Sequence, residues 1–126
     1  MTALLEHANF TVSDPAATAA WMQTLFGWHI RWQGDALAGG HTVHVGTKER
    51  YLALYTPQGG VEGTATPYRF AGSLNHIAVV VPDLDAVEQR VRLHGFETGN
   101  HQDYEPGRRF YFHDADGIEY EVVQYD

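Results

Sequence analysis

The sequence has 126 residues, no cysteine and a formal net charge of −8. The length fits one domain, and the lack of cysteine excludes disulfides, cysteine-ligated zinc, iron–sulfur clusters and thiol nucleophiles. The acidic balance argues against nucleic acid or an anionic membrane surface as a partner, because both attract basic proteins. No apolar run is long enough to cross a bilayer and no signal peptide is recognisable, so a cytoplasmic location is expected.

The first predicted elements are a strand and a helix. Residues 5–14 read LEHANFTVSD, a short apolar run that ends at Asp14, and residues 15–26 have a helix-like composition. A carboxylate at Asp14 suits an N-cap, since it accepts hydrogen bonds from the first free helix amides. Gly27 suits the left-handed residue that closes a helix. Two more strands are expected at 42–45 and 51–55, around a turn at 46–49.

The second half of the chain repeats the first. Residues 74–83 follow the pattern of 5–14, with His76 placed 69 residues after His7. A second helix is expected between Asp83 and Gly95, followed by strands at 110–113 and 118–125 around the turn DADG. The sequence therefore predicts one α+β domain of two β-α-β-β-β modules. Their expected bounds are 4–56 and 73–126, joined by a Gly-, Pro- and Thr-rich linker at 57–72.

Two histidines and one glutamate form the candidate site. His7 and His76 begin equivalent strands and point away from the helices by strand parity, while Glu121 is expected to be partly buried in the last strand. Two imidazoles and a carboxylate that face one cavity suit a divalent metal and leave open positions for substrate. The plainer interpretation is that the histidines are surface or structural residues and that the glutamate faces solvent.

The motifs at 7–14, 25–28, 75–79 and 110–121 resemble those of the vicinal oxygen chelate superfamily. This superfamily includes glyoxalase I, bleomycin-resistance proteins, extradiol dioxygenases and fosfomycin-resistance enzymes. The resemblance implies that the paired modules form a curved, incompletely closed barrel around a divalent metal ion (Fe, Mn, Zn, Ni or Co). The metal ligands that it implies are His7, His76 and Glu121.

The resemblance also places three other residues. Tyr111 is implied as the catalytic residue that reaches the substrate, where a hydroxyl stabilises developing negative charge; the alternative is an ordinary strand aromatic. Ala53 occupies the position where glyoxalase I carries a carboxylate, which puts that activity in doubt. Arg108 and Arg109 are expected in a loop before the Tyr111 strand, either as a clamp for a carboxylate or phosphate or, as we favour, as a solvated pair.

Two functions follow as alternatives. The first is a metal-dependent enzyme, dioxygenase-like or lyase- or isomerase-like, that acts on a small molecule whose adjacent oxygens chelate the metal. The second is a metal-free binding protein of the bleomycin-resistance kind, which the alanine at position 53 favours. A homodimer is expected from the resemblance, with the site either in one chain or shared between two.

Overall fold

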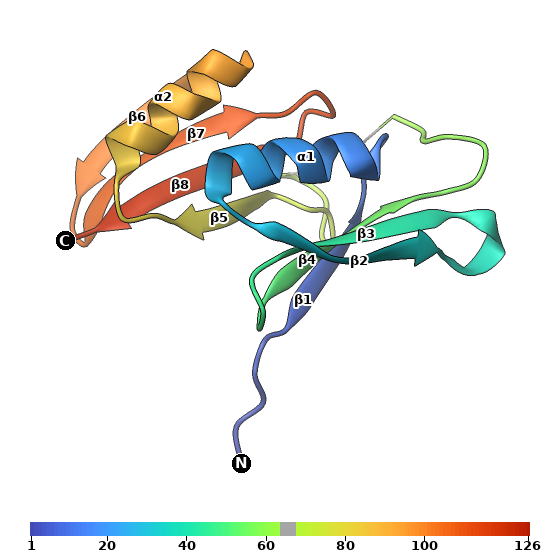
Figure 1. Ribbon diagram of the computed structural model, residues 1–126. Helices are drawn as coiled ribbons and strands as arrows, with labels where there is room; N and C mark the ends of the chain where they lie inside the picture. Colours follow the sequence, from blue (N-terminus) through green and yellow to red (C-terminus); the bar gives the residue numbers. More distant parts are fainter. Residues whose placement is uncertain (64–67) are drawn as a thin grey trace. The chain divides into compact units, whose positions relative to one another are not determined.

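The computed structural model describes residues 1–63 and 68–126. The chain divides into two compact units, Met1–Gly63 and Thr64–Asp126. Each unit contains a strand, a helix and three further strands in that order (Figure 1). The predicted α+β class with two β-α-β-β-β modules is therefore confirmed. The expected linker, 57–72, includes residues 64–67, which lie outside the described residues.

Unit 1 is a four-stranded mixed sheet with one helix. Its strands are ordered β1-β4-β3-β2, with β1 parallel to β4 and the other pairs antiparallel. The elements are β1 (His7–Thr11), α1 (Pro15–Phe26), β2 (His29–Asp35), β3 (His41–Gly46) and β4 (Tyr51–Thr56), with a short 3-10 turn at Leu37–Gly39.

Unit 2 has the same topology. Its strands are ordered β5-β8-β7-β6, with β5 parallel to β8 and the other pairs antiparallel. The elements are β5 (His76–Val80), α2 (Leu84–His94), β6 (Thr98–Tyr104), β7 (Gly107–His113) and β8 (Glu119–Tyr125). The internal repeat of the sequence is thus a repeat of one supersecondary unit.

Both helices begin and end where the sequence predicts. The Asp14 carboxylate accepts a hydrogen bond from the Ala17 amide, and the Asp83 carboxylate accepts one from the Ala86 amide, each at 3.1 Å. Gly27 has a φ of 71° and Gly95 a φ of 111°. A side chain is strained at such a positive φ, which is why glycine closes these helices.

Each helix covers one face of its own sheet, and the core of each unit lies between its helix and its sheet (Figure 1). In unit 2, Tyr120 and Val122 of β8 are fully buried together with Phe110 and Phe112 of β7. Because side chains alternate along a strand, Glu119 and Glu121 project to the face opposite Tyr120 and Val122. The buried core therefore fixes which face of β8 carries the carboxylates.

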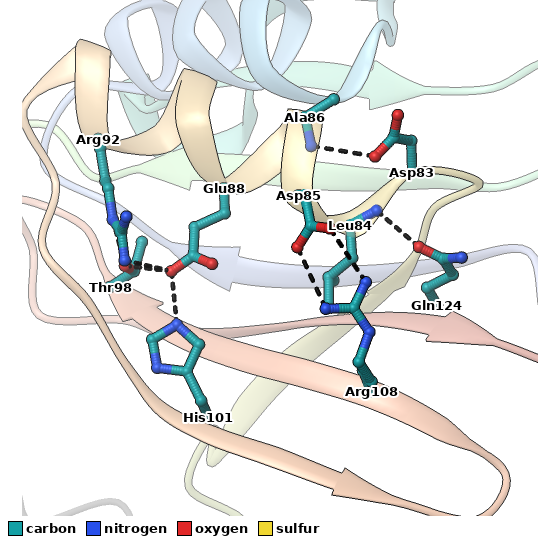
Figure 2. A network of polar contacts seen from close by, with 10 residues as sticks. All are labelled: Asp83, Leu84, Asp85, Ala86, Glu88, Arg92, Thr98, His101, Arg108 and Gln124. Carbon is teal, nitrogen blue, oxygen red and sulfur yellow. Dashed lines mark hydrogen bonds and ion pairs between the residues drawn. The ribbon is translucent and has the colours of Figure 1, made fainter.

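A polar network joins α2 to β6 and β7 (Figure 2). The Glu88 carboxylate accepts hydrogen bonds from Thr98, Arg92 and His101 at 2.5, 2.9 and 2.6 Å. At the other end of the helix, Arg108 pairs with Asp85 at 3.1 Å. These contacts hold the helix against its sheet on the side away from the glutamates of β8.

Candidate functional site

The candidate site in unit 2 is built on the strand face that carries Glu119 and Glu121. Strand register places Glu121 between Ala78 of β5 and Tyr111 of β7, and Glu119 between His76 and His113. The small Ala78 side chain leaves room for the longer side chains of this face. Three of the four predicted site residues, His76, Tyr111 and Glu121, therefore come from three adjacent strands.

His76 and Glu121 face each other directly. The His76 Nε2 atom lies 3.3 Å from Glu121 Oε1. On the other side of the ring, Nδ1 lies 2.5 Å from Asn75 Oδ1 and 3.8 Å from Glu119 Oε1. Both ring nitrogens of His76 therefore face acceptor oxygens, Nδ1 those of Asn75 and Glu119 and Nε2 that of Glu121.

Glu121 has a second partner on its other oxygen. Arg109 Nη1 donates to Glu121 Oε2 at 3.0 Å, and the two side chains are only 11% and 10% exposed. The Arg109 guanidinium also lies over the Tyr104 ring, 4.4 Å from its centroid. The expectation of a solvated arginine pair in a loop was wrong for Arg109, which lies in β7 with its side chain turned to the site. Arg108, the preceding residue, also lies in β7 and is exposed.

Glu119 contacts His76, as described above, and also Tyr68 and His113. The Tyr68 hydroxyl donates a hydrogen bond to Glu119 Oε1, and this bond raises the pKa of Tyr68 to about 12. His113 Nε2 lies 3.4 Å from Glu119 Oε2. Sequence reasoning missed Tyr68, because position 68 was expected only as linker, and it missed Glu119, because the resemblance singled out Glu121 alone.

Tyr111 contacts both predicted ligands in its unit. Its ring meets the His76 ring edge to face, with centroids 6.0 Å apart, and its hydroxyl is hydrogen-bonded to Glu121. Burial and the nearby Glu121 charge raise the pKa of Tyr111, so the hydroxyl stays protonated and donates at neutral pH. Tyr111, His113 and Glu119 also line a cavity of about 480 Å³ whose remaining wall comes from residues 95–100 and from Asp114 and Ala115.

His7 lies in unit 1 and has its own set of neighbours. Its Nδ1 atom lies 2.8 Å from Glu6 Oε1, and this hydrogen bond lowers the pKa of Glu6. Nδ1 of His7 thus faces an oxygen of the preceding residue, as Nδ1 of His76 does. The His7 ring stacks on Tyr51 with centroids 4.9 Å apart, and Tyr51 stacks on His44 at 4.7 Å.

Imidazole and carboxylate are groups that divalent metals accept as ligands. In both histidines an oxygen of the preceding side chain contacts Nδ1, the arrangement that commonly orients a metal-binding imidazole through its other nitrogen. Ala53 pairs with Asn9 and His44 in the sheet and offers no donor of its own. Among the residues that the structure describes, no group of three or more histidine or acidic side chains is positioned to hold a metal ion.

The fold and these residues define a class of protein: paired β-α-β-β-β modules with imidazole and carboxylate groups on their sheets. Residues 4–122 match the Glyoxalase/Bleomycin resistance protein/Dioxygenase superfamily, and the chain belongs to it. No curated protein matches the chain significantly. The structure contains no helix, among its described residues, that is long and apolar enough to span a membrane.

Solved structures share the fold over the whole chain. A glyoxylase/bleomycin resistance protein/dioxygenase domain from Frankia sp. EAN1pec is 22% identical with a TM-score of 0.83, and covers 100% of both chains. TnmS3, an antibiotic binding protein from Streptomyces sp. CB03234, is 20% identical with a TM-score of 0.75, covering 99% of this chain and 98% of its own. The fosfomycin resistance protein FosX from Listeria monocytogenes is 21% identical with a TM-score of 0.69, covering 100% and 96%.

Proposed function

We propose that this protein is a divalent-metal-dependent enzyme, dioxygenase-like or lyase-like, with His7, His76 and Glu121 as the metal ligands. The observation that carries the proposal is the pair of potential ligand atoms in unit 2, His76 Nε2 and Glu121 Oε1, which face each other at 3.3 Å. An imidazole nitrogen and a carboxylate oxygen at this distance either share a proton or bind one cation, and the proposal takes the second arrangement. His7 supplies the third ligand in this proposal.

The substrate in this proposal is a small molecule with adjacent oxygens. A bound divalent ion of Fe, Mn, Zn, Ni or Co supplies Lewis-acid polarisation of such oxygens. In this proposal the Tyr111 hydroxyl exchanges its hydrogen bond to Glu121 for one to a substrate oxygen and stabilises the negative charge that develops there. Asn75 and Glu6 hold the two imidazoles in the orientation that leaves Nε2 free.

The cavity beside Tyr111 supports a small-molecule substrate. Its volume of about 480 Å³ lies within the range of small-molecule sites, and its polar lining groups include Tyr111, His113 and Glu119. A substrate in this cavity lies beside Tyr111, the residue that we assign to catalysis.

A second candidate function is metal-free binding of a small molecule, as in bleomycin-resistance-like proteins. The Arg109–Glu121 ion pair favours it, because the guanidinium already balances the carboxylate charge. Ala53, which provides no donor, favours it as well.

Metal analysis distinguishes the two functions. Protein purified without chelators is expected to carry one divalent ion per site, and His7→Ala, His76→Ala and Glu121→Gln are each expected to lose it while remaining folded. His29→Ala, at an exposed position of β2, is the control and keeps the metal. A parent protein without metal that cannot be loaded, or a His76→Ala variant with unchanged metal content, contradicts the enzyme proposal.

We further propose that the protein is a homodimer and acts in the cytoplasm. Light scattering tests the oligomeric state. Mixing His7→Ala chains with Glu121→Gln chains then separates the two arrangements of the site. If each site takes residues from both chains, a mixed dimer regains one intact site, and about a quarter of all sites bind metal after random mixing. If each site lies within one chain, mixing restores none.

A further inference from the structure

The cavity of unit 2 has a wall position, Gly99, where the sheet offers room for a side chain and the sequence provides none. Gly99 of β6 pairs with Tyr111 of β7, so a side chain at position 99 would lie beside Tyr111 on the same face. A Cβ atom at Gly99 would meet no atom of the described residues within 4 Å, apart from those of its chain neighbours. The space beside Tyr111 therefore belongs to the cavity of about 480 Å³ that both residues line.

The backbone does not require glycine at this position. The φ of Gly99 lies outside the left-handed region that strains other residues, in contrast to that of Gly95, whose φ of 111° closes α2. The register of β6 shifts between Gly99 and Gln102, but the residue with a positive φ in this bulge is Asn100, at 51°.

A glycine inside a strand weakens the strand, and it often marks a bulge, a close backbone or the approach of a ligand. At Gly99 the positive φ of the bulge falls on the next residue, and no described backbone lies within reach of a Cβ atom. The approach of a ligand is the role that remains. Because the position lies beside Tyr111 in the cavity wall, a ligand there would fill the space that a side chain would otherwise take.

The groups around this space indicate the charge of such a ligand. Among the described lining residues the only basic side chain is His113, and the acidic ones are Glu97, Asp114 and Glu119. The rings of Phe96 and Tyr111 belong to the same wall. Carboxylates that line a hollow attract cations, and aromatic rings bind an ammonium group through their faces. The empty position at Gly99 marks the site, and the carboxylates and rings favour an organic cation in it.

We propose that Gly99 is a specificity-determining residue that keeps the space beside Tyr111 open for an ammonium-bearing group of the ligand. The ligand class is a small organic amine whose ring or short chain fills this space. The inference deepens the proposed function, and it rests on that function only in placing a small molecule in this cavity.

Benzylammonium is the probe for the ligand class, with benzyl alcohol and benzoate as the neutral and anionic molecules of similar shape. Backbone amide shifts of the isotope-labelled parent protein, followed by nuclear magnetic resonance, give both the affinity and the location. Shifts centred on residues 95–100, with benzylammonium bound about tenfold more tightly than benzyl alcohol, support the inference. Shifts centred elsewhere, no shifts, or equal or tighter binding of benzyl alcohol or benzoate overturn it.

Gly99→Val tests the position, with Gly63→Val as the matched control. Gly63 also lacks a positive φ and has open space around its Cβ position, but it lies in unit 1 and does not line the cavity. Valine suits a strand and fills the space beside Tyr111. Benzylammonium binding is therefore expected to fall at least tenfold in Gly99→Val, while Tm stays at or above that of the parent protein. Gly99→Ala is expected to show a smaller loss of binding.

A glycine that serves only the structure predicts the opposite pattern. A Tm of Gly99→Val clearly below that of the parent protein, or parent-like binding of benzylammonium by this variant, overturns the inference. The amide shifts of the parent protein give the answer if Gly99→Val does not fold.

Glu97→Gln tests the charge of the cavity. Glu97 is the exposed carboxylate of the wall, and its loss is expected to weaken benzylammonium binding about threefold. Glu49→Gln, at an exposed position of unit 1, is the control and leaves binding unchanged. Unchanged affinity in Glu97→Gln overturns the assignment of an ammonium group.

Metal analysis separates this inference from the proposed enzyme. Benzylammonium binding that depends on Gly99, in a protein that cannot be loaded with metal, supports the inference and contradicts the metal-dependent enzyme. A protein that binds metal through His76 and does not bind benzylammonium overturns the inference and leaves the enzyme proposal intact.

Discussion

Two glutamates on one face of β8 differ in what their neighbours allow them to do. Glu119 is approached by Tyr68, His76 and His113, so both of its oxygens have partners that belong to the protein. Glu121 has Arg109 on one oxygen and the His76 imidazole opposite the other. Glu121 is thus the carboxylate placed between a guanidinium and an imidazole, while Glu119 contacts the phenol of Tyr68 and two imidazoles.

The contact between Tyr68 and Glu119 is testable by titration. The hydrogen bond to Glu119 raises the pKa of Tyr68 to about 12, so at pH 11 this phenol is expected to remain mostly protonated. Carbon-13 labelling of the tyrosine ζ position resolves the individual phenols by nuclear magnetic resonance, and the Tyr68→Phe variant assigns the signal. A Tyr68 signal that is fully shifted to the phenolate position at pH 11 contradicts this contact.

The residues that precede the two histidines should affect metal binding without being ligands. Asn75→Ala and Glu6→Ala remove the oxygens that contact Nδ1 of His76 and His7. Partners of this kind typically contribute about 10- to 100-fold in metal affinity, and we expect a loss in that range from each substitution. Calorimetric Co(II) titration measures it, with circular dichroism as the check on folding. Unchanged affinity in both variants means that these contacts do not orient the rings for an ion.

At the scale of elements, the sequence placed both helices but did not place two of the strands that the β-α-β-β-β pattern includes. A capping carboxylate and a closing glycine bound each helix, and such signals act locally. The strands β2 and β6 are rich in polar residues and largely exposed on both faces, so they lack the alternation that indicates a strand. Arg109 was misplaced for a related reason: its burial depends on Glu121, a residue of another strand, and no local pattern records that partner.

The helix caps should contribute measurably to stability. Asp14→Ala and Asp83→Ala each remove the acceptor for an amide in the first helical turn. Each is expected to lower the free energy of unfolding by about 1 kcal/mol. Urea denaturation measures the loss, and the corresponding Asn variants serve as controls because asparagine also caps well. An Asp→Ala variant as stable as the parent protein contradicts the role of that cap.

The contact of α2 with β6 should depend on pH through Glu88. Burial raises the pKa of Glu88, but hydrogen bonds from Thr98 and His101 outweigh burial, and the pKa lies below its usual value. Because the folded pKa lies below the unfolded one, this stabilisation is present above the unfolded pKa and disappears as the pH falls through the folded pKa. Glu88→Gln is therefore expected to cost on the order of 1 kcal/mol at pH 7.

The difference between Glu88→Gln and the parent protein is expected to shrink as the solution is acidified below the usual pKa of a glutamate. Thermal unfolding followed by circular dichroism across this pH range measures the change. A difference that stays constant down to the acid limit of folding means that Glu88 acts through packing and not through its charge.

At the scale of the whole molecule, one topology is used twice with different side chains. Ala53 of β4 and Glu121 of β8 lie at equivalent positions, and so do His44 and Tyr111, their partners on the adjacent strands. The repeat in the sequence was sufficient to predict the two modules, the parity of their strands and the equivalence of His7 and His76. It did not predict the ring stack around Tyr51 or the ion pair of Arg109, because these depend on side-chain contacts between strands.

If the ion is shared as we propose, metal binding should stabilise the chain through residues of both units. A ligand at a hundred times its dissociation constant stabilises the folded state by about 2.7 kcal/mol. Scanning calorimetry of the parent protein with excess Co(II) is therefore expected to show a clear rise in Tm, which His29→Ala retains. His7→Ala in unit 1 and His76→Ala in unit 2 are both expected to abolish most of that rise, because each removes one imidazole from the same ion. A rise that survives His7→Ala but not His76→Ala means that unit 2 holds the ion without help from unit 1.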